Sequence, residues 1–308
     1  MIEIQNLSRR YGSVQALKNV NLRVEKGSVL GLLGQNGAGK TTLLNILTGY
    51  LAPTEGRVLL NGFDPLLQPE EAKRHLGYLP EQPPLYDEMT VREYLRFASE
   101  LRGVERRAIP AHVDEVMELT GLSDMRSRLI GHLSKGYRQR TGMAQAMCGD
   151  PEVLVLDEPT VGLDPKQVTE IRALIRTLGK GRTIVFSSHI LSEVQQLCSH
   201  VVILDGGEVR LDSSISAMND PDEITLLCIF AAEESRVAAR LKELDGVCHV
   251  VFESAPKPEL SAVRLTFSQV AEPERRVFGL FSSMNIPVFH LSRTEDSLEA
   301  VFLRVISQ

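Results

Sequence analysis

The stretch VLGLL (Val29–Leu33) followed directly by GQNGAGKT (Gly34–Thr41) decides the fold of this chain. The first five residues form an unbroken apolar run, which is typical of a strand buried on both faces of a parallel sheet. The next eight match the pattern GxxxxGK[ST], and a helical pattern continues over Thr42–Leu47. A strand, a glycine-rich loop and a helix in this order predict a loop whose backbone N–H groups face a polyphosphate.

The sequence of the loop predicts which of its residues contact which part of that polyphosphate. The helix that follows it adds unpaired N–H donors and partial positive charge. We expect Lys40 to reach the β- and γ-phosphates of ATP and the Thr41 hydroxyl to ligate Mg²⁺. The predicted nucleotide-contacting residues of this segment are Gly34, Gln35, Asn36, Gly37, Ala38, Gly39, Lys40, Thr41 and Thr42.

Polar side chains follow two further apolar strands. Val153–Leu156 ends in Asp157 and Glu158, and the apolar run up to Phe186 is followed by Ser187, Ser188 and His189. A carboxylate pair at a strand end is often merely solvated. Beside a phosphate-binding loop, however, Asp157 is suited to hold Mg²⁺ and Glu158 to deprotonate the attacking water. We expect His189 to donate a hydrogen bond to a phosphate oxygen. The predicted catalytic residues are therefore Glu158, His189 and Lys40.

Strand-like and helical patterns alternate from Ile2 to about Asp212, which indicates an α/β fold with a largely parallel core sheet. We expect helices over Val91–Leu101, Val113–Leu119 and Val168–Leu178. The polar region from Leu211 to about Glu223 is predicted to be a linker. The segments after it predict the order βαββαβ, a small ferredoxin-like α+β layer, with one extra helix over Ser297–Val305. The predicted domains are residues 1–212 and 213–308.

Composition restricts the partners of the chain. The formal net charge is −6, whereas a nucleic-acid-binding surface is usually basic, so we expect no nucleic-acid partner. The longest apolar runs are about the length of a strand, far below the roughly 20 residues that a membrane span needs. We therefore expect a soluble chain that reaches any membrane through other subunits.

The segment LSKGYRQR (Leu133–Arg140), upstream of the acidic strand, gives the pattern its specificity. It resembles the signature of the ATP-binding cassette (ABC) ATPases, usually written LSGGQ. The resemblance covers Ile2 to about Asp212. It implies a P-loop NTPase cassette with a parallel core sheet, an antiparallel subdomain and a helical subdomain. The departures are Lys135 in place of the first signature glycine and Tyr137 in place of its glutamine.

The resemblance implies further site residues. Two cassettes of this family pair head to tail around two ATP molecules, so Ser134 and Gly136 are expected to cap the γ-phosphate bound by a partner cassette. Tyr11 takes the place of an aromatic residue that stacks on adenine. The family's glutamine near Mg²⁺ falls on Glu81, with Gln82 next to it, and both alternatives stay open. Asp164 belongs to a segment that resembles the D-loop, which couples the two sites of the dimer.

Within the family, the chain is most similar to the single-cassette subunits of ABC-2-type exporters, including multidrug-export and gliding-motility subunits. The expected function is ATP hydrolysis with Mg²⁺, coupled to transport by separate multi-span permease subunits at the cytoplasmic face of the membrane. The expected assembly is a pair of cassettes, either two copies of this chain or this chain with a close relative. The alternative is a non-transport ABC ATPase associated with translation or DNA repair.

Overall fold

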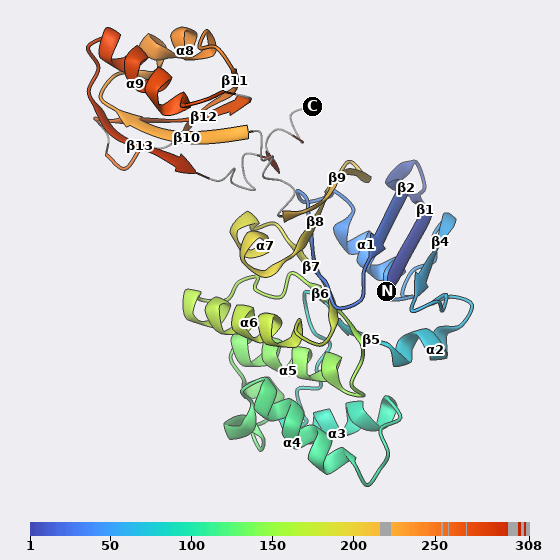
Figure 1. Cartoon of the computed structure of the whole chain (residues 1–308). Helices are drawn as coiled ribbons and strands as arrows, with labels where there is room; N and C mark the ends of the chain where they lie inside the picture. The colour runs from blue at the N-terminus through green and yellow to red at the C-terminus, as the bar shows by residue number, and fades with distance from the viewer. Residues whose placement is uncertain are drawn as a thin grey trace. The chain divides into compact units, whose positions relative to one another are not determined.

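The computed structural model describes residues 1–215, 223–253, 255–257, 259–268, 270–294, 301–302 and 305 (Figure 1). The chain divides into two compact units. The first spans Met1–Ile215, and the second contains the described residues from 223 to 302. The limits of the two domains, placed at residue 212 from the sequence, stay a prediction.

A six-stranded sheet forms the centre of the first unit (Figure 1). Its strand order is β5-β6-β7-β3-β8-β9, and the first five strands run parallel. The strands are β3 (Val29–Leu33), β5 (Leu76–Leu79), β6 (Val153–Asp157), β7 (Thr183–Ser188), β8 (His200–Asp205) and β9 (Glu208–Ser214). Because β6, β7 and β3 are neighbours, their carboxyl ends meet at one edge, where the polar residues predicted from the sequence follow.

Strand β9 corrects one prediction, because Leu211–Ser214 do not belong to a linker. These residues pair antiparallel with β8 along the edge of the sheet. In β9, Arg210 and Asp212 are exposed and the other residues are half-buried. An edge strand needs only modest burial on one face, so its sequence can be polar. For this reason the segment was predicted to be a linker.

A three-stranded antiparallel sheet packs beside the central sheet, as the family resemblance implies. It has the order β2-β1-β4 and consists of β1 (Ile2–Tyr11), β2 (Val14–Val24) and β4 (Glu55–Leu60). Its buried residues, including Ile4, Leu17 and Val58, share one core with Leu32 and with Leu44 of the first helix. This shared core joins the glycine-rich loop to both sheets.

Seven α-helices are described in the first unit. They are α1 (Lys40–Leu47), α2 (Pro69–Arg74), α3 (Val91–Leu101), α4 (Ile109–Leu119), α5 (Lys135–Met147), α6 (Pro165–Leu178) and α7 (Leu191–Leu197). The α3 prediction is confirmed, and a capping box between Thr90 and Glu93 sets its start. Helix α4 begins four residues before its predicted start because proline, here Pro110, is tolerated in a first turn. Among the described residues, no helix is long and apolar enough to cross a membrane.

The second unit is a four-stranded antiparallel sheet with two helices. Its elements are β10 (Glu223–Phe230), α8 (Glu234–Lys242), β11 (Val247–Glu253), β12 (Ser261–Ser268), α9 (Pro273–Ser283) and β13 (Val288–Thr294), in the predicted order βαββαβ. The strand order is β11-β12-β10-β13. Phe230 and Phe281 are fully buried and pack with their ring centroids 4.8 Å apart. Most of the predicted helix Ser297–Val305 lies outside the described residues.

Candidate functional site

The glycine-rich loop between β3 and α1 has two positions at which only glycine fits. Gly39, the N-cap of α1, has φ = 107°, and a Cβ atom there would lie 2.7 Å from the backbone oxygen of Ala16. A Cβ atom on Gly34 would lie 2.5 Å from the backbone oxygen of Leu204. The loop is thus folded closely between β2 and β8. This compact turn is the geometry in which successive N–H groups point at one anion.

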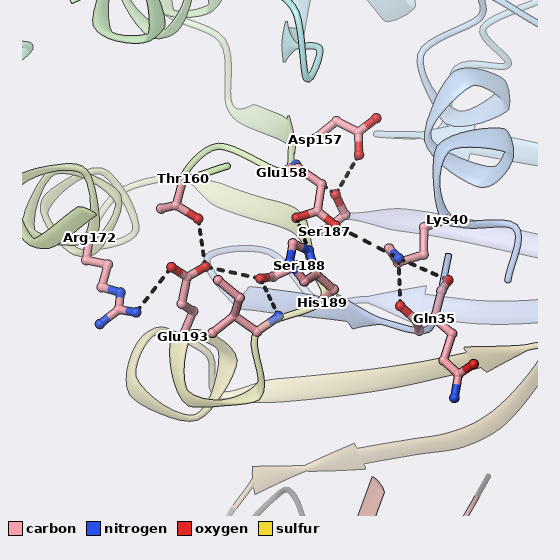
Figure 2. Close-up of polar contacts among 12 residues, drawn as sticks. Gln35, Lys40, Asp157, Glu158, Thr160, Arg172, Ser187, Ser188, His189 and Glu193 are labelled. Carbon is pink, nitrogen blue, oxygen red and sulfur yellow. Dashed lines mark hydrogen bonds and ion pairs between the residues drawn. The ribbon is translucent and has the colours of Figure 1, made fainter. Parts of the chain in front are cut away.

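Lys40 lies inside this turn. Its side chain is buried, with the residue only 7% exposed. Its Nζ atom donates hydrogen bonds to the backbone oxygens of Gly34, at 2.7 Å, and Gln35, at 3.3 Å. The same ammonium lies 3.9 Å from Oε1 of Glu158. The lysine therefore carries its charge between the loop and the tip of β6 (Figure 2).

The loop opens onto a cavity of about 350 Å³. The residues that line it are Ala16, Gln35, Asn36, Gly37, Gly39, Lys40, Thr41, Thr42, Glu81, Glu158, Val161 and His189. Most of the predicted nucleotide-contacting loop is in this set, together with all three predicted catalytic residues. The glycine-rich turn, a lysine, a glutamate and a histidine thus line one cavity, which is an arrangement suited to a polyphosphate and a water molecule.

Glu158 projects into this cavity from an unusual backbone conformation. Its φ angle is 46°, in the left-handed region that a residue with a side chain seldom adopts. Its backbone N–H donates to the hydroxyl of Ser187 at 2.9 Å. Its Oε2 atom lies 2.9 Å from Nδ1 of His189. The carboxylate is therefore held between the imidazole and the ammonium of Lys40, where it is placed to accept a proton from a water molecule.

Asp157 lies behind Glu158 and is almost fully buried, with 2% exposure. One carboxylate oxygen accepts a hydrogen bond of 2.6 Å from the hydroxyl of Ser187 (Figure 2). Ser187 thus orients both acidic residues from the neighbouring strand, a role that the sequence analysis did not assign. The signal available in the sequence was only a hydroxyl at the end of the third apolar strand.

The oxygen donors fit a magnesium ion that is shared with a phosphate. Among the described residues, no group of three or more His, Cys, Asp or Glu side chains is arranged to hold a metal. Mg²⁺ is seldom held by an all-protein cage and prefers one or two carboxylates together with phosphate oxygens and water. Thr41 and Glu81 line the cavity, and Asp157 directly precedes Glu158 outside the described lining. These three are the predicted ligands.

The two alternatives at positions 81 and 82 differ in their placement. Glu81 lines the cavity, whereas Gln82 is outside the set of lining residues that the structure describes. The loop after β5 thus brings residue 81, rather than residue 82, to the lining of the cavity.

Tyr11 lies at the end of β1, outside the described lining of the cavity, and is 46% exposed. The guanidinium carbon of Arg9 lies 4.8 Å from the centroid of its ring. A cation over one face leaves the other face of the phenol ring for an aromatic partner.

The signature segment lies apart from the cavity of its own chain. Ser134 is the N-cap of α5 and accepts a hydrogen bond of 3.5 Å from the backbone N–H of Tyr137. Gly136 is packed so closely on α6 that a Cβ atom would lie 2.5 Å from the side chain of Gln167. Asp164 caps α6 through the backbone N–H of Gln167 at 2.9 Å. At the start of α5, Ser134 and Lys135 are exposed, whereas Gly136 is buried. The first N–H groups of a helix have no acceptor within the helix itself.

A second cavity, of about 480 Å³, lies between the central sheet and the helical segment. It is lined by Thr48, Tyr50, Glu70, Lys73, Arg74, Leu76, Tyr78, Pro80, Pro84, Leu101, Arg102, Gly103 and Gln145. Tyr50 and Leu101 on its rim are among the most exposed large apolar side chains, at 77% and 72%. Burial raises the pKa of the Tyr78 phenol, and the charge of Asp157 adds to that effect. We refer to this cavity as the rim groove.

Comparison with known proteins assigns the first unit to one family. The family described as ABC transporter matches residues 17–161. The chain is 38% identical over 228 residues to the ABC transporter ATP-binding protein NatA of Bacillus subtilis, which covers 72% of this chain and 93% of NatA. It is 32% identical to the bacitracin transport ATP-binding protein BcrA of Bacillus licheniformis, covering 99% of this chain and 97% of BcrA. A methionine import ATP-binding protein, MetN 1 of Paraburkholderia xenovorans, is 35% identical over 80% of this chain and 77% of its own length.

Solved structures agree with these relatives. An ATP-binding subunit of an ABC transporter superposes with a TM-score of 0.66 at 30% identity, covering 71% of this chain and 92% of the other. The dimeric structure of the bacterial ABC transporter cassette MJ0796 superposes with a TM-score of 0.65 at 25% identity, covering 70% of this chain and 99% of the other.

Proposed function

Since this chain belongs to the ABC transporter family as an ATP-binding, ATP-hydrolysing subunit, we propose that it drives an ABC-2-type exporter whose membrane subunits are separate chains. The observation that carries the site assignment is the convergence on one cavity of Lys40, Glu158 and His189, which come from the start of α1 and from the segments after β6 and β7. The family's coupling of ATP hydrolysis to transport supplies the reaction that these groups serve.

The proposed mechanism begins with ATP binding at the glycine-rich loop. The backbone N–H groups of Gly34–Thr41 and the ammonium of Lys40 hold the phosphates. Thr41, Asp157 and Glu81 would hold Mg²⁺, which when bound neutralises charge on the transferring phosphoryl group. Tyr11 stacks on the adenine ring. These contacts bind and orient the nucleotide before any bond breaks.

Hydrolysis then needs a base for the attacking water and groups that stabilise the negative charge developing on the phosphate. The Glu158 carboxylate takes a proton from the water that attacks the γ-phosphate. His189, at 2.9 Å from that carboxylate, keeps Glu158 in place and donates to the phosphate with its other ring nitrogen. Lys40 stabilises the negative charge that accumulates on the β- and γ-phosphate oxygens. This proposal is supported by the position of all three residues in the lining of one cavity.

A second cassette completes the site in this proposal. Ser134 and Gly136 lie away from the cavity of their own chain, and α5 has no acidic residue in its first turn. The start of α5 is therefore suited to meet the γ-phosphate held by a partner. ATP then favours the closed dimer because its γ-phosphate is shared by two sets of donors, and hydrolysis removes that shared anion. A homodimer is the simplest such pair, and Asp164 lies beside the contact.

Replacing Ser134 with arginine is expected to prevent closure of the dimer. A long cationic side chain at the exposed N-cap would collide with the partner, while the ATP-binding loop stays intact. We expect ATP affinity of the monomer within about threefold of the unmodified chain and no ATP-dependent dimer in size-exclusion chromatography. The Ser282→Arg variant on the exposed face of α9 is the matched control. An ATP-dependent dimer of Ser134→Arg would contradict the role in the partner's site.

The assignment to export rests on the extent of similarity to the relatives. The match to BcrA, a transport protein, spans 99% of this chain, including the second unit. The match to the importer MetN 1 covers 80%. Similarity over the whole length therefore favours the transporters of the BcrA kind. The rim groove, with its exposed Tyr50 and Leu101, is where we place a segment of the membrane subunit at the cytoplasmic face.

A Leu101→Glu variant tests this partner. Leu101 is 72% exposed, so its replacement should cost little stability, but a carboxylate on the rim disfavours an apolar contact. Affinity purification from detergent-solubilised membranes, followed by mass spectrometry, is expected to recover a multi-span protein with the unmodified chain. We expect at least tenfold less of it with Leu101→Glu. Leu119→Glu, which is exposed on α4 outside the described lining of the groove, is the control. Recovery of ribosomes or nucleic acid instead would favour the non-transport alternative.

A further inference from the structure

A buried carboxylate that the mechanism above does not use lies behind the His189 loop. Glu193, in the first turn of α7, has no exposed surface. Its Oε2 atom accepts hydrogen bonds from the hydroxyls of Thr160, at 2.8 Å, and Ser188, at 3.1 Å. Its Oε1 atom accepts one of 3.1 Å from the guanidinium of Arg172 (Figure 2). Burying an ionised carboxylate is costly, and three charge-assisted contacts offset that cost.

The three partners of Glu193 come from three segments that meet at the site. Thr160 is two residues after Glu158, and Ser188 directly precedes His189. Arg172 lies on α6, the helix that Asp164 caps. The Ser188 hydroxyl also accepts the backbone N–H of Ile190 at 3.0 Å, so it binds both ends of the turn that carries His189. A single carboxylate therefore connects the loop of the base, the loop of the imidazole and α6.

His189 depends on this connection for its position. Its side chain is 49% exposed, so packing alone does not fix the imidazole. The hydrogen bond of 2.9 Å to Glu158 exists only if the two loops keep their distance. Ser187 holds the start of the Glu158 loop, and Thr160 holds its end through Glu193.

We propose that Glu193 is a positioning residue for ATP hydrolysis, which holds His189 and the Glu158 loop at hydrogen-bond distance and so sets the turnover rate. This inference rests on the proposed roles of Glu158 and His189. It predicts a separation of effects, because Glu193 contacts the catalytic loops and none of its described partners belongs to the ATP-holding segment Gly34–Thr41.

The Glu193→Gln variant is expected to lower kcat at least tenfold and to change KM for ATP by less than threefold. The side chain keeps its size, but an amide loses the negative charge that draws the two hydroxyls and Arg172 together. A shift of about 1 Å between reacting groups can cost roughly a hundredfold in rate, so a modest relaxation of the two loops is enough. Steady-state phosphate release by the full chain measures both constants.

Two further variants separate positioning from stability. In Glu193→Gln with Arg172→Met, the guanidinium is no longer buried without its carboxylate, so the melting temperature should rise towards that of the unmodified chain while kcat stays low. Ser188→Ala removes one of the hydroxyl contacts and is expected to lower kcat at unchanged KM. Its effect should add less than fully to that of Glu193→Gln, because the two groups act together. Glu152→Gln, which breaks a surface pair with Lys26, is the matched control with unchanged kcat.

The result that overturns the inference is a kcat within twofold of the unmodified chain for both Glu193→Gln and Ser188→Ala. Recovery of kcat together with melting temperature in the Arg172→Met double variant would overturn it as well, since the effect would then be one of stability. Glu158→Gln, assayed alongside, separates this failure from that of the proposed function. If Glu158→Gln abolishes turnover while Glu193→Gln and Ser188→Ala keep kcat within twofold of the unmodified chain, only the positioning role is contradicted. If Glu158→Gln hydrolyses ATP at the normal rate, the proposed role of Glu158 is contradicted as well.

Discussion

A Glu158→Gln variant is expected to bind ATP with nearly unchanged affinity and to hydrolyse it at least a hundredfold more slowly. The amide cannot accept the proton of the attacking water, and general-base catalysis typically contributes about 10²–10⁴-fold. The substitution keeps the shape of the side chain, which is held between Nδ1 of His189 and the ammonium of Lys40. Phosphate release with excess ATP and Mg²⁺ measures the loss.

The same variant should accumulate as an ATP-bound dimer. Hydrolysis is the step that removes the γ-phosphate shared by the two cassettes, so its loss leaves the closed state favoured. Size-exclusion chromatography with ATP and Mg²⁺ detects this dimer. The Glu152→Gln variant, with its carboxylate on the surface far from the loop, is the matched control and should hydrolyse ATP normally. Turnover of Glu158→Gln at the unmodified rate would show that another group is the base.

Lys40→Ala is expected to weaken ATP binding at least about a hundredfold. Charge-assisted hydrogen bonds are worth roughly 1.5–3 kcal/mol each, and Lys40 would make such contacts with two phosphates. Every 1.4 kcal/mol corresponds to a tenfold change in affinity, so losing both contacts gives an effect of this size. Calorimetric titration with ATP and Mg²⁺ measures it directly.

The loop around Lys40 requires a check on folding in this experiment. Its Nζ atom also donates to the backbone oxygens of Gly34 and Gln35, so its loss removes contacts that shape the turn. Circular dichroism and thermal unfolding should show an intact fold, because the surrounding strands do not depend on the ammonium. Lys26→Ala, with an exposed side chain, is the control for loss of one positive charge. ATP affinity of Lys40→Ala within threefold of normal would contradict the phosphate assignment.

The elements that the sequence predicted best are those with a local cause. The strand Val29–Leu33 and helix Val91–Leu101 have the predicted bounds, because continuous burial and a capping box are both encoded within a few residues. Errors arose where the signal was weak. Helix α4 starts earlier than its apolar pattern, and Leu211–Ser214 form an edge strand despite their polar composition. Pairing with β8 decided the bounds of the edge strand, and a proline tolerated in the first turn allowed the earlier start of α4.

The site residues differ in the same way: some could be identified from local sequence, and others could not. The eight-residue loop Gly34–Thr41 could be identified from its order of glycines and lysine, since all its phosphate donors are adjacent in the chain. The choice between Glu81 and Gln82 could not be made, because neighbouring residues on a loop point in different directions that depend on packing. Ser187 and Glu193 could not be assigned a role from the sequence, since a hydroxyl or a carboxylate is informative only beside its partner.

The sequence by itself determined a phosphate-binding loop, an acidic strand end and a cassette signature, because each is a short run whose chemistry depends on adjacent residues. Only the tertiary structure decided that Glu158 and His189, 31 residues apart, lie 2.9 Å from each other and that Lys40 reaches the same carboxylate. The strand order β6-β7-β3 creates these contacts. That order results from packing across the whole sheet, and hydrogen bonds act only over about 3 Å, so no local pattern of residues specifies them.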